Sequence, residues 1–186
     1  MHEYLPKLFI FLDQYNNLIF KNNITNIGII YRNYRSKNRE DELMKIAKAC
    51  KNKKIKLYIS NNLKLAIKFK ADGIYIPAFN KTERFNNMEK RNMTIIGSAH
   101  NQKEIQEKMK QRCSAIFLSP IFSVKKRKKF LDIHKFNILS RKNKINFFAL
   151  GGISQHNISK LKLLNIKGFG GIGMFKKKPA FKRPVF

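Results

Sequence analysis

Eight short apolar segments begin roughly 20 to 30 residues apart along this chain, and they limit its fold more than any other feature. They span residues 8–13, 27–32, 56–60, 73–77, 93–97, 115–119, 146–150 and 168–173. Continuous apolar character, rather than strict alternation, is typical of strands that are buried on both faces. The segments therefore predict the parallel strands of an α/β fold.

The stretches between these strands carry helical patterns. Residues 39–50 carry acidic side chains in their first turn, which the positive end of a helix dipole favours. Their apolar positions fall on one face, and these are Leu43, Ile46, Ala47 and Cys50. Residues 62–69, 101–111 and 154–164 show the same pattern. Asn101 and Ser154 are the expected N-caps of the last two.

Strands that alternate with helices form a parallel sheet, and eight of them predict closure into one (β/α)₈ TIM-type barrel over residues 1–186. The chain is short for this fold, which typically takes about 250 residues. Residues 14–23 hold barely two helical turns, and residues 174–186 include two prolines. We therefore expect reduced first and last helices. A doubly wound open sheet is the alternative.

The formal net charge of +29 is of the kind found in proteins that bind nucleic acids. The lysines, however, are spread over nearly every helix and loop and accompany abundant Asn and Ile, a composition that indicates codon bias. No recognition helix or RNA-binding aromatic motif is evident. We therefore expect no nucleic-acid partner, although a polyanion-binding protein remains an alternative reading.

Two further features bear on the compartment. No stretch of 18 apolar residues occurs, so we expect no membrane span, and we interpret the apolar start of the chain as a first strand instead of a signal peptide. Cys50 and Cys113 lie far apart without metal-ligand spacing, which favours buried free thiols. Both features suit the cytoplasm.

Ligands of such barrels bind at the carboxyl ends of the strands, and glycines follow the last two strands here. Gly151 and Gly152 come directly after one strand, where we expect a helix to begin, and Gly173 lies at the end of the other. Glycines let a backbone approach a ligand closely, and the N–H groups that begin a helix attract phosphate. These glycines predict a phosphate site, although they could instead only relieve crowding.

Two other features end strands at the same rim. A loop after residue 119 leads into the basic run 125–129, which could hold a diphosphate or be a solvated loop. His100 follows the fifth strand, where a histidine serves either as a general acid or base or as a brace for the next helix.

The order of motifs resembles that of thiamine-phosphate synthase and the related TenI-type thiazole tautomerases. The resemblance covers nearly the whole chain and rests on ISNNLKLAIKFKADGIYIP, GSAHNQKEI, AIFLSPIF and FALGGIS. It implies that hydroxymethylpyrimidine diphosphate and thiazole phosphate, two small phosphorylated substrates, are joined to give thiamine phosphate and pyrophosphate. It also implies a dissociative displacement assisted by Mg²⁺ and basic groups.

Carried over position by position, the resemblance implies roles for twelve residues. Arg32, Ser98 and either Arg127 or Lys128 would act on the diphosphate, and Gly151, Gly152 and Gly173 would hold the thiazole phosphate. The remaining substrate-binding positions are Ser60, Asn61, Tyr75, Asn80 and His100.

The chain departs from the family pattern at several of these positions. Asn61 and Asn80 stand where the family has its two Mg²⁺-binding aspartates, and Tyr75 stands where the family has a histidine. Neutral amides are poorer Mg²⁺ ligands than carboxylates, so no metal site is predicted and a role for Mg²⁺ is left open.

Three functions follow from these observations. The first is an enzyme of thiamine biosynthesis, a transferase of the thiamine-phosphate synthase type. The second is a catalytically degenerate, TenI-like barrel that binds or tautomerises a thiazole phosphate, which the missing acidic pair favours. The third is the polyanion-binding protein. The sequence does not decide whether the chain forms a homo-oligomer.

Overall fold

Eight parallel strands close into a barrel in the order of the sequence, with β1 paired to both β2 and β8. The computed structural model describes residues 5–21, 26–34, 38–86, 88–124 and 129–171. The strands are β1 (Leu8–Leu12), β2 (Ile27–Tyr31), β3 (Lys56–Ser60), β4 (Gly73–Ile76), β5 (Thr94–Ala99), β6 (Ala115–Leu118), β7 (Asn146–Leu150) and β8 (Gly168–Gly171). The predicted barrel is confirmed, and the open sheet is wrong.

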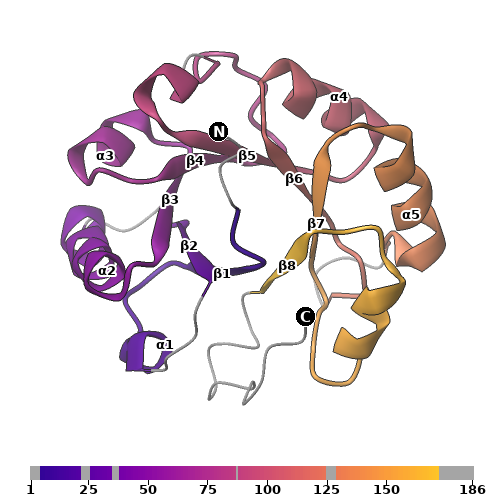
Figure 1. Cartoon of the computed structure of the whole chain (residues 1–186), viewed down its shortest axis with the longest axis horizontal. Coiled ribbons are helices and arrows are strands. Elements are labelled where there is room, and N and C mark those ends of the chain that lie inside the picture. The colour runs from indigo at the N-terminus through magenta and orange to yellow at the C-terminus, as the bar shows by residue number, and fades with distance from the viewer. Residues whose placement is uncertain (1–4, 22–25, 35–37, 87, 125–128, 172–186) are drawn as a thin grey trace.

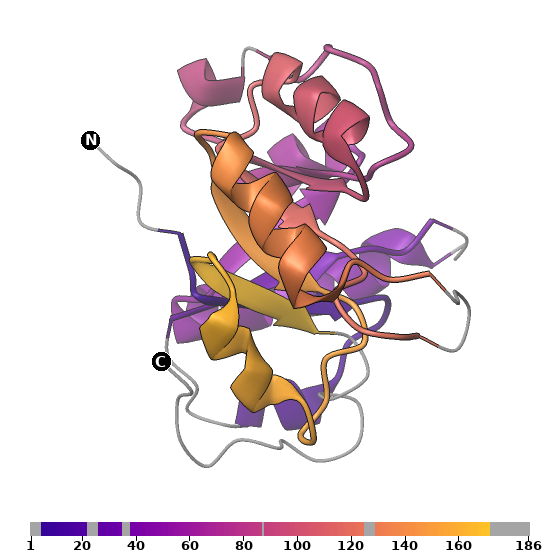
Figure 2. The ribbon, with the colours of Figure 1, turned by 90° about the vertical axis from the view of Figure 1, so that its right-hand side faces the viewer.

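Helices surround the strands, as Figure 1 shows. The α-helices are α1 (Asn17–Lys21), α2 (Arg39–Lys53), α3 (Leu63–Lys68), α4 (Gln102–Lys110) and α5 (Asp132–Lys142), and two 3-10 helices are η1 (Met88–Arg91) and η2 (Ile158–Leu163). Seen from the side, α5 lies along the outside of the barrel (Figure 2). The five-residue α1 confirms the reduced first helix. Residues 174–186, where we expect a short last helix, lie outside the described residues.

The predicted caps have different outcomes. Asn101 caps α4, because its side-chain oxygen accepts a hydrogen bond from the backbone N–H of Glu104 at 3.0 Å. The predicted helix over 154–164 is wrong in its type and its start, since η2 begins only at Ile158 with Asn157 as its N-cap. The Asn157 side chain accepts from the N–H of Ser154 and donates to the carbonyl of Gly152, both at 2.8 Å. These bonds to the preceding backbone fix the bend at residues 151–152 and the chain up to Ser154, a segment that we call the turn after β7.

Side chains of each strand alternate between two apolar regions, one inside the barrel and one between the strands and the helices. The inner region contains six aromatic rings, those of Phe9, Phe11, Tyr58, Tyr75, Phe117 and Phe148. The outer region includes the predicted face of α2, on which Leu43, Ile46 and Cys50 are buried. Cys50 and Cys113 are both buried free thiols, as predicted. In the described parts of the chain, no helix is long and apolar enough to cross a bilayer.

Phe117 is the centre of the inner region. Its ring centroid lies 5.2 Å from that of Phe9, 5.5 Å from that of Phe11 and 5.4 Å from that of Phe148. The side chain is fully buried. Edge-to-face and tilted contacts of this kind add to the stabilisation that burial of the ring provides.

Replacement of this ring should therefore open a cavity inside the barrel. We expect Phe117→Ala to lower the free energy of unfolding by roughly 3–5 kcal/mol, measured by urea denaturation. Phe79→Ala is the control, because the Phe79 side chain is 70 % exposed and should change that free energy by less than about 0.5 kcal/mol. Equal losses in the two variants would contradict this account of the core.

Candidate functional site

The candidate site lies at the carboxyl ends of the strands, where polar side chains continue the inner faces of β2 and β5. Ile30 and Ile96 belong to the inner apolar region. Since side chains of a strand alternate with a period of two, Arg32 and Ser98 continue the same faces toward the rim. The Arg32 guanidinium carbon lies 5.3 Å from the centroid of the Phe11 ring. A cation at this distance from an aromatic face is attracted by it.

Tyr75 brings these two side chains into one group. Its ring packs edge-on against Phe11, with 5.3 Å between the centroids. Burial raises the pKa of the Tyr75 hydroxyl to about 12, against the opposing effects of a hydrogen bond with Ser98 and the positive charge of Arg32. Tyr75 is therefore a neutral hydroxyl at physiological pH. Arg32, Tyr75 and Ser98 together offer a cation and two hydroxyls on the floor of the barrel mouth.

Ser60 and Asn61 end β3 and contact two different loops. The fully buried Ser60 hydroxyl is hydrogen-bonded to the hydroxyl of Tyr34, which follows β2. The Tyr34 ring in turn meets the exposed Phe79 ring edge-on, with 6.4 Å between the centroids. The backbone N–H of Asn61 donates to the carbonyl of Tyr75 at 2.9 Å. These contacts fix the end of β3 against its neighbours.

Asn61 and Asn80 are 19 residues apart in sequence but form a direct pair. The Asn80 side-chain NH₂ donates to the side-chain oxygen of Asn61. The side-chain oxygen of Asn80 accepts from the backbone N–H of Thr82 at 2.8 Å. Each of the two amide oxygens therefore already accepts a hydrogen bond from an N–H group. The contact places two sequence-predicted positions side by side at the ends of β3 and β4.

This pair does not fit the Mg²⁺ ion that the resemblance implies. Mg²⁺ is usually held through carboxylates together with substrate phosphates, whereas both side chains here are neutral and bonded to N–H donors. Among the described residues, no group of three or more His, Cys, Asp or Glu side chains is placed to hold a metal ion.

His100 links the loops that follow β5 and β6. Its Nδ1 lies 2.6 Å from the carbonyl oxygen of Ser119, which can only accept, so Nδ1 carries the proton. The backbone N–H of His100 donates to a carboxylate oxygen of Glu104 at 2.8 Å. The ring is thus oriented as a brace between two loops of the mouth.

Gly151 and Gly152 lie against the loop that follows β6. Gly152 has a φ of +73°, and a Cβ atom there would lie 2.5 Å from the carbonyl oxygen of Phe122. The carbonyl of Gly151 accepts from the N–H of Phe122 at 3.1 Å. No helix begins at these glycines, because η2 begins only at Ile158. The predicted phosphate site would therefore rest on the backbone of the turn after β7 and not on a helix terminus.

Three residues of the predicted site lie outside the described residues. They are Arg127, Lys128 and Gly173. Conversely, sequence reasoning missed Lys108 of α4, which is fully buried and donates to the carbonyl of Asn80. The available signal was its spacing, since Lys108 lies three residues after the buried Ile105 and so shares its face of the helix.

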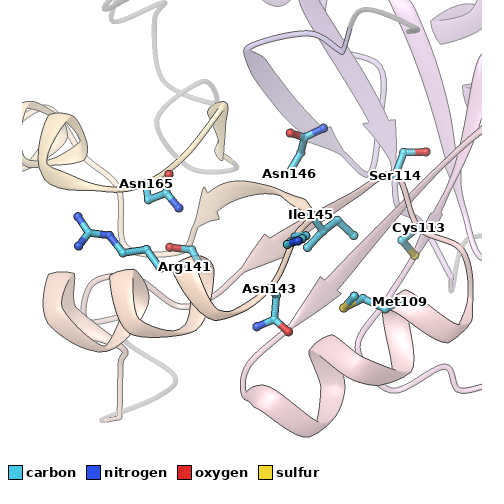
Figure 3. Close-up of a pocket in the computed structure, with 10 residues that line it drawn as sticks. Met109, Cys113, Ser114, Arg141, Asn143, Ile145, Asn146 and Asn165 are labelled. Atoms are coloured by element: carbon cyan, nitrogen blue, oxygen red, sulfur yellow. The ribbon is translucent and has the colours of Figure 1, made fainter. Parts of the chain in front are cut away.

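A hollow at the opposite end of the barrel is shown in Figure 3. It has a volume of about 630 Å³ and is lined by Met109, Cys113, Ser114, Ser140, Arg141, Asn143, Lys144, Ile145, Asn146 and Asn165. These residues belong to the last turns of α4 and α5, precede β6, β7 or β8, or begin β7. None of the predicted site residues that the structure describes lines it.

Comparison with known proteins identifies similar chains. A family model described as thiamine monophosphate synthase matches residues 17–174. The thiamine-phosphate synthase of one Prochlorococcus marinus strain is 30 % identical over 148 residues, which cover 75 % of this chain and 43 % of that protein. A protein described as putative thiamine-phosphate synthase 2 of Aquifex aeolicus is 28 % identical and is matched over 98 % of its length, with 92 % of this chain covered. The chain spans less than half the length of its P. marinus relatives.

Solved structures share the fold at low sequence identity. Thiamine phosphate pyrophosphorylase from Pyrococcus furiosus has a TM-score of 0.74 at 16 % identity, covering 89 % of this chain and 85 % of its own. The corresponding protein from Bacteroides thetaiotaomicron has a TM-score of 0.64 at 15 % identity, with coverages of 96 % and 89 %. These likenesses show the barrel.

The close approach at Gly152 leads to a first prediction for the site. A side chain there would occupy a left-handed conformation and collide with the backbone of Phe122. We expect Gly152→Ala to lower the free energy of unfolding by about 1–3 kcal/mol in urea denaturation. His156→Ala, an exposed position of the same segment, should leave it unchanged. An unaltered Gly152→Ala variant would mean that the loop after β6 is not tied to the turn.

The amide pair leads to a second prediction, which concerns the metal. Mn²⁺ titrations followed by electron paramagnetic resonance should detect no ion bound at the Asn61–Asn80 pair. The double variant Asn61→Asp/Asn80→Asp should gain a bound ion, because two adjacent carboxylates repel one another unless a cation or a proton lies between them. Equal Mn²⁺ binding by both proteins, abolished by Asn61→Ala/Asn80→Ala, would show that the amides do hold a metal.

Proposed function

This chain belongs to the thiamine monophosphate synthase family, and from that membership we propose that it joins hydroxymethylpyrimidine diphosphate to thiazole phosphate. The products would be thiamine phosphate and pyrophosphate. Family membership gives the chain a role in thiamine biosynthesis. The specific reaction is the proposal, because the identities are modest and less than half of each P. marinus relative is matched.

The observation that supports the proposal best is the group formed by Arg32, Tyr75 and Ser98. It combines one permanent cation with two neutral hydroxyls at the rim toward which the strands point. The hydroxyls can donate hydrogen bonds to phosphate oxygens, and the guanidinium can bind them in a bidentate manner. The aromatic floor beneath the group keeps water away from one side of it, which strengthens these interactions.

The chemistry of the reaction fits such a group. The C–O bond between the pyrimidine methylene and the diphosphate breaks, and its electron pair leaves with pyrophosphate. The thiazole nitrogen then forms a new C–N bond to the methylene carbon. The charge that develops during this step is on the leaving diphosphate, so preorganised donors and cations at that position stabilise the transition state. Arg32, Tyr75 and Ser98 would act on this group.

The turn after β7 would hold the second substrate. Gly151 and Gly152 have positive φ angles of +91° and +73°, which turn the backbone sharply at the end of the strand. The turn is fixed by the two hydrogen bonds of Asn157 and by the loop after β6. A rigid backbone free of side chains at this rim is suited to close contact with the phosphate of the thiazole.

A second candidate function is binding or tautomerisation of a thiazole phosphate without diphosphate chemistry. The observation that favours it is the neutral Asn61–Asn80 pair, which removes the acidic pair of the family pattern. The turn after β7 would serve either function. The two candidates differ in whether the protein releases pyrophosphate.

The test is to mix the purified protein with both substrates and to measure thiamine phosphate after oxidation to fluorescent thiochrome. We expect product above the no-enzyme control. Arg32→Ala should lower kcat/KM by about 100-fold or more, as loss of one preorganised charge-stabilising group does. Arg141→Ala, at the opposite end of the barrel, is the matched control and should change kcat/KM by less than twofold.

The outcomes separate the two candidates. Binding of thiazole phosphate without any product would contradict the synthase and support the second function. A wild-type rate in the Arg32→Ala variant would contradict the placement of the diphosphate at Arg32. Wild-type protein that binds neither substrate would overturn both functions.

A further inference from the structure

Lys108 is a fully buried lysine on the inner side of α4, next to the loop that carries Asn80. Lysine is almost never fully buried unless its charge is paired or hydrogen-bonded, because removal of the ammonium group from water is costly. Its Nζ donates to the backbone carbonyl of Asn80 at 2.6 Å and to the side-chain oxygen of Gln111 at 2.7 Å. Burial lowers the pKa of Lys108, while Cys113, Glu107 and Glu104 act in the opposite direction.

Strand β5 has a space for this side chain at Gly97. A Cβ atom at Gly97 would lie 2.8 Å from Cδ of Lys108 and 2.9 Å from Sγ of Cys113. Real Cβ atoms do not approach other atoms so closely. Gly97 and Lys108 therefore form a complementary pair, in which the absence of a side chain on the strand lets the lysine stem pass between α4 and β5.

Lys108 and Gln111 hold the backbone of the loop after β4 from the helix side. Gln111, which is itself buried, donates its side-chain NH₂ to the carbonyls of Asn80 at 3.0 Å and Thr82 at 2.8 Å. The carbonyl of Asn80 thus accepts from both side chains. On the opposite side, the Asn80 side chain contacts the N–H of Thr82 and the side chain of Asn61.

These bonds form one continuous connection from α4 through the loop after β4 to the end of β3. The buried ammonium is its only formally charged member among the residues named, and hydrogen bonds to a charged donor are stronger than neutral ones. Lys108 does not reach the mouth itself, so any effect on a ligand has to pass through Asn80.

We propose that Lys108 is a positioning residue, which fixes the loop after β4 so that Asn80 and Asn61 meet at the mouth and contact the diphosphate-bearing substrate. The contact with substrate rests on the proposed function. The role in fixing the loop does not, since it follows from the hydrogen bonds alone.

The test compares Lys108→Met with Lys110→Met. Methionine keeps the length and the apolar stem of lysine but has no donor, and Lys110 is an exposed lysine of the same helix. In hydrogen exchange followed by NMR, the amide of Thr82 should exchange about tenfold faster or more in Lys108→Met, the effect expected from loss of one hydrogen bond to a charged group. Amides of β6 and β7 serve as the internal reference. Their exchange rates should change only as far as the global stability of the protein changes.

Binding provides the second measurement. Lys108→Met should weaken the binding of inorganic pyrophosphate at least about tenfold, while thiazole phosphate, held at the turn after β7, should bind within about twofold of wild type. A general loss of folded structure would weaken the binding of both ligands equally. If Lys108→Met fails to fold, Gly97→Ala provides the second variant. It keeps the ammonium group but fills the space of the lysine stem, so it should give both faster Thr82 exchange and weaker pyrophosphate binding.

Each result decides a separate point. Unchanged Thr82 exchange in Lys108→Met and Gly97→Ala would overturn the positioning role. Faster exchange with equal losses for the two ligands would overturn the link from the loop to the diphosphate. Wild-type protein that binds neither ligand would overturn the proposed function, and the exchange of Thr82 would still decide the role of Lys108.

Discussion

Edge-to-face packing of aromatic rings inside the barrel determines where a site can form in this protein. Phe9, Phe117 and Phe148 fill the interior with ring centroids 5.2–5.4 Å apart. Arg32 and Ser98 lie beyond these rings, at the rim. Tyr75 stands at the boundary, since its ring belongs to the core while its hydroxyl meets Ser98. The floor of the candidate site is therefore the upper surface of the core.

The electrostatics of the mouth depend on two neutral amide side chains, which lie after β3 and in the loop after β4. Two adjacent carboxylates would need a cation or a proton between them, whereas the neutral amides of Asn61 and Asn80 are joined directly by one hydrogen bond. Positive charge at the mouth is then supplied by Arg32, held over the face of Phe11. In the proposed reaction a leaving diphosphate would need stabilisation of negative charge, and the Arg32 cation and the hydroxyls of Tyr75 and Ser98 would contribute to it.

The loops of the mouth are fixed by contacts to the next element along the barrel. His100 ties the loop after β5 to Ser119 after β6, and the Gly151 carbonyl ties the turn after β7 to Phe122. Lys108 does the same for the loop after β4 from beneath. Loops that carry binding residues are mobile by default, so such ties reduce the entropy lost when a ligand binds.

The sequence by itself determined the strands and the barrel, because continuous apolar runs that alternate with helical patterns are local properties of a chain. It also identified the cap at Asn101. Only the tertiary structure decided that Asn61 meets Asn80, that Lys108 is buried beneath them, and that the turn at Gly152 delays η2 until Ile158. These features depend on contacts between loops and helices that barrel closure brings together. Local periodicity carries no information on such pairs. A lysine or an asparagine in a helix or a loop is therefore predicted to be exposed until its partner in the tertiary structure is known.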